Sequence, residues 1–199
     1  MSNYKEFKLT QYTKSGGWGA KFSLEDLGQI LNLFNLDNKN PNILVDASTR
    51  DDAAVYKIND DTCIALTVDF FPPNVDDPYT YGQISAANSM SDIYAMGGNP
   101  IIGLNIAAFP KKFPIEIINR ILLGAKEKCD EANLSIIGGH TIYDEEPKYG
   151  LAVIGTINCN DIKKNNTAKE GDLLILTKPL GTGIITQSIK TNTNNLDSA

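Results

Sequence analysis

The sequence is poor in the residues that build disulfide scaffolds and zinc sites. It has three cysteines and one histidine among 199 residues. Cys63, Cys129 and Cys159 are widely spaced and form no C-x-x-C pair, which argues against a disulfide framework or a structural zinc site. We therefore expect reduced, buried thiols, as in a cytosolic protein.

Clustered positive charge and long apolar runs are also missing. The chain has 18 basic and 24 acidic residues, for a net charge of -6. An acidic chain is a poor match for nucleic acid, whose phosphates are bound by clustered cations. No apolar run reaches the roughly 18 residues of a membrane span, and residues 1–17 lack the apolar segment of a secretory signal. We expect a cytoplasmic protein without nucleic-acid or membrane partners.

The hydrophobic pattern predicts a mixed α+β fold. With 42% hydrophobic residues, the chain can build a substantial core. Periodicity predicts helices from 23 to about 38, over 80–96 and from 114 onward, and strands over 54–58, 62–71, 101–109, 134–137, 151–157 and 172–177. Because several strands follow one another without a helix, we expect a mixed sheet packed with helices rather than a doubly wound parallel sheet.

Carboxylates lie within elements that are otherwise apolar. Asp69 ends the small-residue face of the strand at 62–71, and Asp92 lies inside a helix, one turn after Asn88. A buried charge needs a partner, and hard oxygen ligands of this kind suit Mg²⁺. Asp51 and Asp52 precede a strand, where a turn-forming role is an equally good explanation for Asp51 alone.

Glycines and one lysine offer groups that bind phosphate. Gly138 and Gly139 precede His140, and further glycines precede the last helix. Amides exposed by glycine can hold phosphate, although most such glycines only shape turns, and neither segment matches the P-loop pattern. Lys21 ends a Gly-rich arm at 1–22, which we expect to be flexible, and its ammonium group is a suitable phosphate partner.

These residues belong to motifs that resemble the selenophosphate synthetase family, in order and over nearly the whole chain. The motifs are LTQY at 9–12, the Gly-rich arm ending in Lys21, TRDDAAVY at 49–56, TVDFF at 67–71, VDDP at 75–78, ANSMSDIYAMGG at 87–98, GGHT at 138–141 and LTKPLG at 176–181. The resemblance implies the aminoimidazole ribonucleotide synthetase-like fold, in which this domain pairs with a second copy across a shared β-barrel and ATP binds at the dimer interface. The implied reaction makes selenophosphate, AMP and phosphate from ATP, selenide and water with Mg²⁺.

The same resemblance implies roles for single residues. Asp52 and Asp92 would bind Mg²⁺, and Lys21 would be catalytic. The residues around the ATP phosphates would be Lys21, Thr49, Arg50, Asp51, Asp69 and Asp92. Gly139, His140 and Thr141 would reach the nucleotide from the second copy.

The family pattern also implies a division of the chain and a set of alternatives. Residues 23–177 would form the ATP-binding and dimerisation domain, and 178–199 would begin a second domain, so we expect this piece to dimerise but to catalyse poorly. Within the same superfamily, a thiamine-phosphate kinase or a hydrogenase-maturation relative is an alternative. A non-catalytic nucleotide-binding dimerisation module is another.

Position 18 departs from the family pattern. The family usually carries cysteine or selenocysteine three residues before the lysine, whereas this chain has Trp18, with Ala20 at a second frequent cysteine position. An indole cannot act as a thiolate or selenolate nucleophile. Arginine occurs only at 50 and 120 while lysine, asparagine and isoleucine abound, which is typical of an AT-rich genome.

We predict that codon 18 is UGA, a selenocysteine codon written as tryptophan. The intact glycines on both sides of the position support this reading. Sequencing the gene tests it, and a UGG codon would end the hypothesis.

Overall fold

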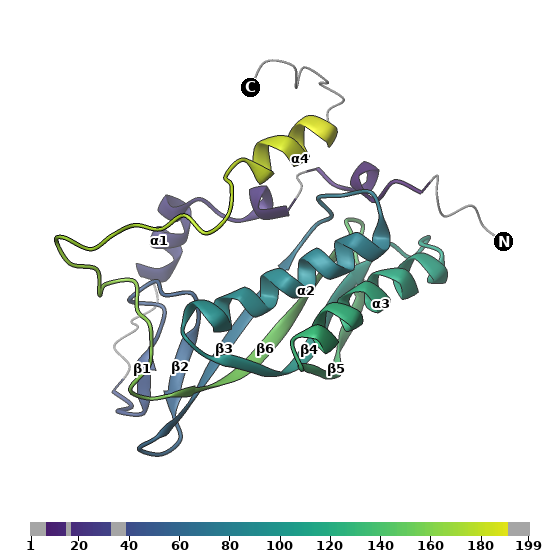
Figure 1. Cartoon of the computed structure of the whole chain (residues 1–199). Helices are drawn as coiled ribbons and strands as arrows, with labels where there is room; N and C mark the ends of the chain where they lie inside the picture. Colours follow the sequence, from purple (N-terminus) through teal and green to yellow (C-terminus); the bar gives the residue numbers. More distant parts are fainter. Residues whose placement is uncertain (1–6, 15–16, 33–38, 191–199) are drawn as a thin grey trace.

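The fold is one six-stranded sheet with two long helices packed on one of its faces (Figure 1). The computed structural model describes residues 7–14, 17–32 and 39–190. The strands are β1 (Ile43–Val45), β2 (Ala54–Lys57), β3 (Thr62–Phe71), β4 (Asn99–Phe109), β5 (Ser135–Tyr143) and β6 (Lys148–Asn158). The helices are α1 (Leu24–Asn32), α2 (Pro78–Ala95), α3 (Ile115–Glu131) and α4 (Thr182–Lys190), and 3-10 turns form η2 (Leu9–Tyr12) and η3 (Gly17–Ala20).

The sheet is mixed, as predicted. Its strand order is β1-β2-β3-β6-β4-β5, with β4 and β5 parallel and every other neighbouring pair antiparallel. The parallel pair is joined through α3, because parallel neighbours need a crossover connection. The α+β fold class is therefore confirmed, whereas the barrel requires a second copy and remains a prediction.

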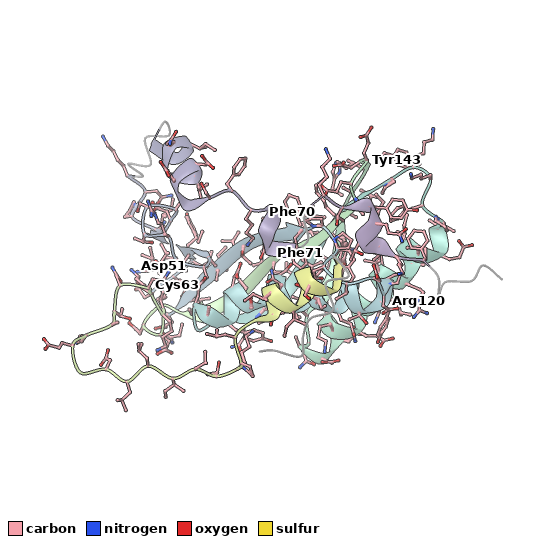
Figure 2. The ribbon with its side chains drawn as sticks, turned by 90° about the horizontal axis from the view of Figure 1, so that it is seen from above. Asp51, Cys63, Phe70, Phe71, Arg120 and Tyr143 are labelled. Carbon is pink, nitrogen blue, oxygen red and sulfur yellow. A yellow bond between two sulfur atoms is a disulfide. The ribbon has the colours of Figure 1, made fainter. Side chains whose placement is uncertain are left out.

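The two faces of the sheet differ because side chains alternate along each strand. Phe70 and Phe71, both labelled in Figure 2, are neighbours on β3, yet Phe70 is 44% exposed and Phe71 only 1%. The buried residues of β3 face α2 and join the core. The alternate residues, among them Leu66 and Val68, stay exposed on the opposite face.

Glycine allows α2 and α3 to pack closely. A Cβ atom on Gly82 would lie 1.9 Å from the carbonyl oxygen of Ile121, and one on Gly124 would lie 2.1 Å from that of Tyr79. At the start of α2, Asp77 caps the helix by accepting a hydrogen bond from the Thr80 amide at 2.7 Å. These contacts fix α2 against α3 and set the residue at which α2 begins.

The predicted strand at 172–177 is wrong. No described strand pairs with this segment, and the side chains of Leu173 to Leu176 are 67% to 99% exposed. A strand needs a hydrogen-bonding neighbour, and high β-propensity does not replace it. A second difference is that Gly138 and Gly139, expected in a turn, lie inside β5.

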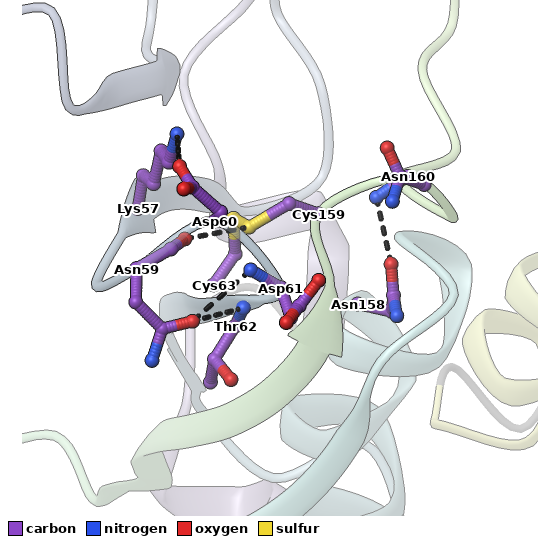
Figure 3. The surroundings of a disulfide bond; sticks show 9 residues. All are labelled: Lys57, Asn59, Asp60, Asp61, Thr62, Cys63, Asn158, Cys159 and Asn160. Atoms are coloured by element: carbon purple, nitrogen blue, oxygen red, sulfur yellow. Dashed lines mark hydrogen bonds and ion pairs between the residues drawn. A yellow bond between two sulfur atoms is a disulfide. The ribbon is translucent and has the colours of Figure 1, made fainter.

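The expectation of reduced thiols is also wrong for two cysteines. Cys63 and Cys159 form a disulfide with a Cα–Cα distance of 5.3 Å (Figure 3), and only Cys129 is a free, buried thiol. The β3–β6 ladder pairs Cys63 with Ile157, two residues before Cys159. The ladder therefore brings together two cysteines separated by 96 positions in the sequence.

The described part of the predicted flexible arm is anchored on the domain. Leu9 is fully buried. The Thr10 hydroxyl donates to the Asp76 carboxylate at 2.6 Å, and the Gly17 amide donates to the carbonyl of Pro72 at 3.0 Å. The proposed limits of the arm and of the domains stay predictions. None of the helices in the described ranges is long and apolar enough to cross a membrane.

Candidate functional site

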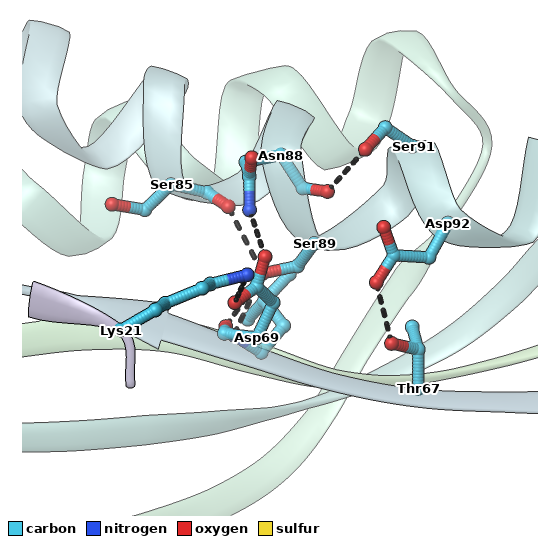
Figure 4. Close-up of polar contacts among 9 residues, drawn as sticks. Lys21, Thr67, Asp69, Ser85, Asn88, Ser89, Ser91 and Asp92 are labelled. Carbon is cyan, nitrogen blue, oxygen red and sulfur yellow. Dashed lines mark hydrogen bonds and ion pairs between the residues drawn. The ribbon is translucent and has the colours of Figure 1, made fainter. Parts of the chain in front are cut away.

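The predicted site residues of β3 and α2 face one another across the junction of sheet and helix (Figure 4). Thr67 and Asp69 are two residues apart on β3 and so share its helix-covered face. Asn88 and Asp92 are four residues apart on α2 and so share one side of that helix. This brings together two carboxylates that lie 23 positions apart in the sequence.

Asp69 is held by donors from three directions. Lys21 Nζ lies 2.9 Å from Asp69 Oδ1, and the side chain of Asp69 is 9% exposed while that of Lys21 is 54% exposed. The Asn88 side-chain amide donates to Asp69 Oδ2. The buried Ser89 hydroxyl lies 2.9 Å from the backbone carbonyl oxygen of Asp69. Both carboxylate oxygens are thus paired, which lets this charge be buried.

Asp92 lies in the electrostatic field of the neighbouring acidic residues. Burial is the main cause that raises the pKa of Asp92, and the charges of Asp69 and Asp52 raise it further. The Thr67 hydroxyl, which donates to Asp92 Oδ2 at 2.7 Å, and the Lys21 charge lower the pKa. The charges of Asp52, Asp69 and Lys21 therefore all act on Asp92.

The loop before β2 is built around Asp51. Its carboxylate accepts the Thr49 hydroxyl at 2.6 Å and the Asn165 backbone amide at 2.6 Å. Asn165 also donates from its side chain to the Arg50 carbonyl at 2.9 Å. Arg50 has φ +55°, a left-handed conformation that is uncommon without glycine. Sequence reasoning missed Asn165, because nothing in its own segment indicates a contact 114 positions away.

The residues at 139–141 lie apart from this cluster within one chain. Gly139, His140 and Thr141 are exposed on β5, and β6 and β4 stand between β5 and β3. Three strand spacings correspond to about 14 Å. Gly139 is required by close packing, because a Cβ atom there would lie 2.4 Å from the carbonyl oxygen of Asn105.

Two carboxylates of the cluster fit a Mg²⁺ site that is completed by other ligands. Among the described residues, no three His, Cys, Asp or Glu side chains form a group that could hold a metal by themselves. Mg²⁺ commonly uses one or two carboxylates together with waters and substrate phosphates. Asp92, with the charge of Asp52 acting on it, offers carboxylate donors of that kind, whereas Asp69 is already paired with Lys21 and Asn88. Trp18 lies in η3, three residues before Lys21, and its side chain is outside the described part.

Replacing Asp92 by asparagine is expected to stabilise the metal-free protein. Because its folded-state pKa is raised, Asp92 adds stability as the pH falls through that pKa, and its charge costs stability at about pH 7. Asp92→Asn should therefore raise the melting temperature at about pH 7, and the difference should shrink toward about pH 4. Thermal unfolding over this range, with the exposed Asp61→Asn as control, measures it. An unchanged or lower melting temperature at about pH 7 would contradict the pKa argument.

Known proteins resemble this chain in sequence over almost its full length. The selenide, water dikinase of Caldanaerobacter subterraneus subsp. tengcongensis is 52% identical over 186 residues, which cover 94% of this chain and 54% of that protein. The selenide, water dikinase of Treponema denticola is 52% identical over 186 residues, covering 94% and 52%. The one from Clostridioides difficile is 47% identical over 183 residues, covering 92% and 53%. The chain spans about half the length of these curated relatives, and the resemblance inferred from the motifs is confirmed.

Solved structures and a family model identify the fold. AaThiL complexed with AMPPCP and TMP has a TM-score of 0.61 at 18% identity, covering 75% of this chain and 48% of that chain. Thiamine monophosphate kinase from Aquifex aeolicus has a TM-score of 0.51 at 20% identity, covering 68% and 44%. Residues 50–157 match the family described as AIR synthase related protein, N-terminal domain. Because that match spans more than half of the chain, the protein belongs to the AIR synthase-related family, of which it carries the N-terminal domain.

Proposed function

We propose that this chain is the ATP- and Mg²⁺-binding part of an enzyme that makes selenophosphate, AMP and phosphate from selenide, ATP and water. Relatives that are 47% to 52% identical carry the name selenide, water dikinase. The observation that carries the proposal is the single site in which Lys21, Asp69 and Asp92 act on one another, with Asp52 in range. This combination of a cation and carboxylates suits a bound metal–nucleotide complex.

Phosphoryl transfer asks a protein mainly for positioning and for stabilisation of charge. Asp52 and Asp92 would hold Mg²⁺, which when bound neutralises phosphate oxygens. Lys21 adds a positive charge at the same place, and Asp69 orients its ammonium group. The Thr49 hydroxyl and the Asn165 amide fix the Asp51 carboxylate, which shapes the loop next to Asp52.

A second copy of the chain would complete the site. The face of the sheet opposite α2 has a groove of about 420 Å³ lined by aliphatic side chains, among them Leu66, Val68, Leu104 and Ile137. Val68 is 60% exposed and Ile137 63%, and an apolar patch of this kind is typical of an interaction surface. Since His140 and its neighbours are about 14 Å from β3 within one chain, a second copy is the simplest way to bring them to the nucleotide.

The alternatives predict different outcomes. The thiamine monophosphate kinase from Aquifex aeolicus shares the fold at 20% identity, which shows a common fold and does not indicate the substrate. A non-catalytic nucleotide-binding dimerisation module would bind the nucleotide without forming selenophosphate or AMP. The higher identity to proteins named selenide, water dikinase favours the selenophosphate reaction.

Binding of ATP is expected to require Mg²⁺ and the two proposed ligands. Titration calorimetry should show binding with Mg²⁺ and little without it. Asp52→Ala and Asp92→Ala should each weaken binding by about tenfold or more, as loss of metal-site groups commonly does. Asp61→Ala, an exposed carboxylate remote from the site, serves as the control. Unchanged affinity in both site variants would refute the site.

The chain is expected to form a dimer through the open face of the sheet. Val68→Asp puts a charge on that face and should convert the dimer into a monomer, because a buried unpaired charge is costly. Ile115→Asp is the matched control, since Ile115 is 61% exposed at the start of α3. Sedimentation equilibrium measures both. A monomeric wild-type chain at micromolar concentration, or a dimeric Val68→Asp, would contradict the interface.

A further inference from the structure

Asn88 lies beside Asp69 and has no role in the proposed function described above. In the sequence it precedes Asp92 by one helical turn. In the structure its amide nitrogen donates to Asp69 Oδ2, while Lys21 Nζ is 2.9 Å from Asp69 Oδ1 (Figure 4). The two oxygens of one carboxylate are therefore held by donors from different elements, one on a helix and one at the end of the arm.

The two donors differ in how firmly they are held. Lys21 is a long side chain that is 54% exposed, so by itself it cannot fix the orientation of Asp69. Asn88 has a short side chain inside the 18-residue helix α2. A donor on a packed helix that holds one carboxylate oxygen leaves the other oxygen turned toward the arm. Asn88 thus sets the direction in which Asp69 presents its second oxygen.

The next residue of α2 fixes the backbone of the same aspartate. The Ser89 hydroxyl accepts a hydrogen bond from the Leu151 amide at 3.1 Å and lies 2.9 Å from the Asp69 carbonyl oxygen. Asp69 and Leu151 are register partners in the β3–β6 ladder. Ser89, which is fully buried, therefore connects both strands at the position of Asp69. Helix α2 holds this residue by its main chain and by its side chain.

An amide suits this place because it donates without adding charge. A second carboxylate would repel Asp69, and a cation would compete with a metal ion at the neighbouring carboxylates. Because Asn88 is neutral, the local charge comes from Lys21 and from Asp52, Asp69 and Asp92. Lys21 remains within electrostatic range of Asp92 while it is paired with Asp69.

We infer that Asn88 is a positioning residue: by orienting the Asp69 carboxylate it holds Lys21, and with it the end of the Gly-rich arm, beside Asp52 and Asp92. Its contribution to nucleotide binding rests on the proposed function. Its contribution to the position of the arm does not, and the two can be measured separately.

The first measurement is Mg²⁺-dependent ATP binding in a double-mutant cycle. Asn88→Ala and Lys21→Met should each weaken binding by about tenfold, and the double variant should be little weaker than Lys21→Met, because the two residues act through one carboxylate. A merely structural effect of Asn88→Ala on affinity would add to the effect of Lys21→Met.

Asn88→Asp, which keeps the size of the side chain but cannot donate when ionised, provides a second variant should the alanine variant fold poorly. Ser91→Ala is the control on the same helix, where the exposed Ser91 hydroxyl donates to the backbone carbonyl of Asn88, and this variant should bind as the wild type does.

The second measurement is hydrogen exchange of the backbone amides of residues 19–21 in the ligand-free protein. These amides should exchange faster in Asn88→Ala, Asn88→Asp and Lys21→Met than in the wild type or Ser91→Ala. Wild-type exchange rates in both Asn88 variants, or additive losses of affinity, would overturn the positioning role. If the wild type shows no Mg²⁺-dependent ATP binding while arm exchange still depends on Asn88, the proposed function fails and the positioning of the arm stands.

Discussion

The site depends on burying the Asp69 carboxylate between a strand and a helix. An ionised carboxylate that is almost fully removed from water is tolerated only when its oxygens are paired. The chain supplies an ammonium group from Lys21, an amide from Asn88 and a hydroxyl from Ser89 at the backbone. Because these donors come from the end of the arm, directly after η3, and from α2, pairing this one carboxylate fixes the arm, the helix and the sheet relative to one another.

In the same arrangement, the surroundings of Asp92 disfavour the ionised form of its carboxyl group. Burial and two neighbouring carboxylates raise its pKa, and Thr67 and Lys21 lower it in part. A cluster of this kind costs the folded chain stability in the absence of a cation, which is common where a binding site is prepared in advance. The two faces of the sheet differ, since one face carries α2 and the cluster while the other exposes an apolar groove.

Local patterns failed where the outcome depended on a distant partner. The segment at 172–177 has the composition of a strand, yet no described strand offers it an edge. Cys63 and Cys159 carry no local sign of pairing, and the β3–β6 register alone brings them into bonding distance. Sequence reasoning missed Asn165 for the same reason, because its backbone amide donates to the distant Asp51 carboxylate. In each case the deciding neighbour lies far away in the sequence.

The sequence by itself determined the mixed α+β class and the family, and it singled out Asp69 and Asp92 as candidates, because alternation, helical spacing and motif order are local properties of the chain. The tertiary structure alone decided that the side-chain amide of Asn88 donates to Asp69. It also decided that His140 lies three strands away from the cluster. Hydrogen-bond direction and strand order arise from packing between distant segments, and no local pattern of residues encodes them.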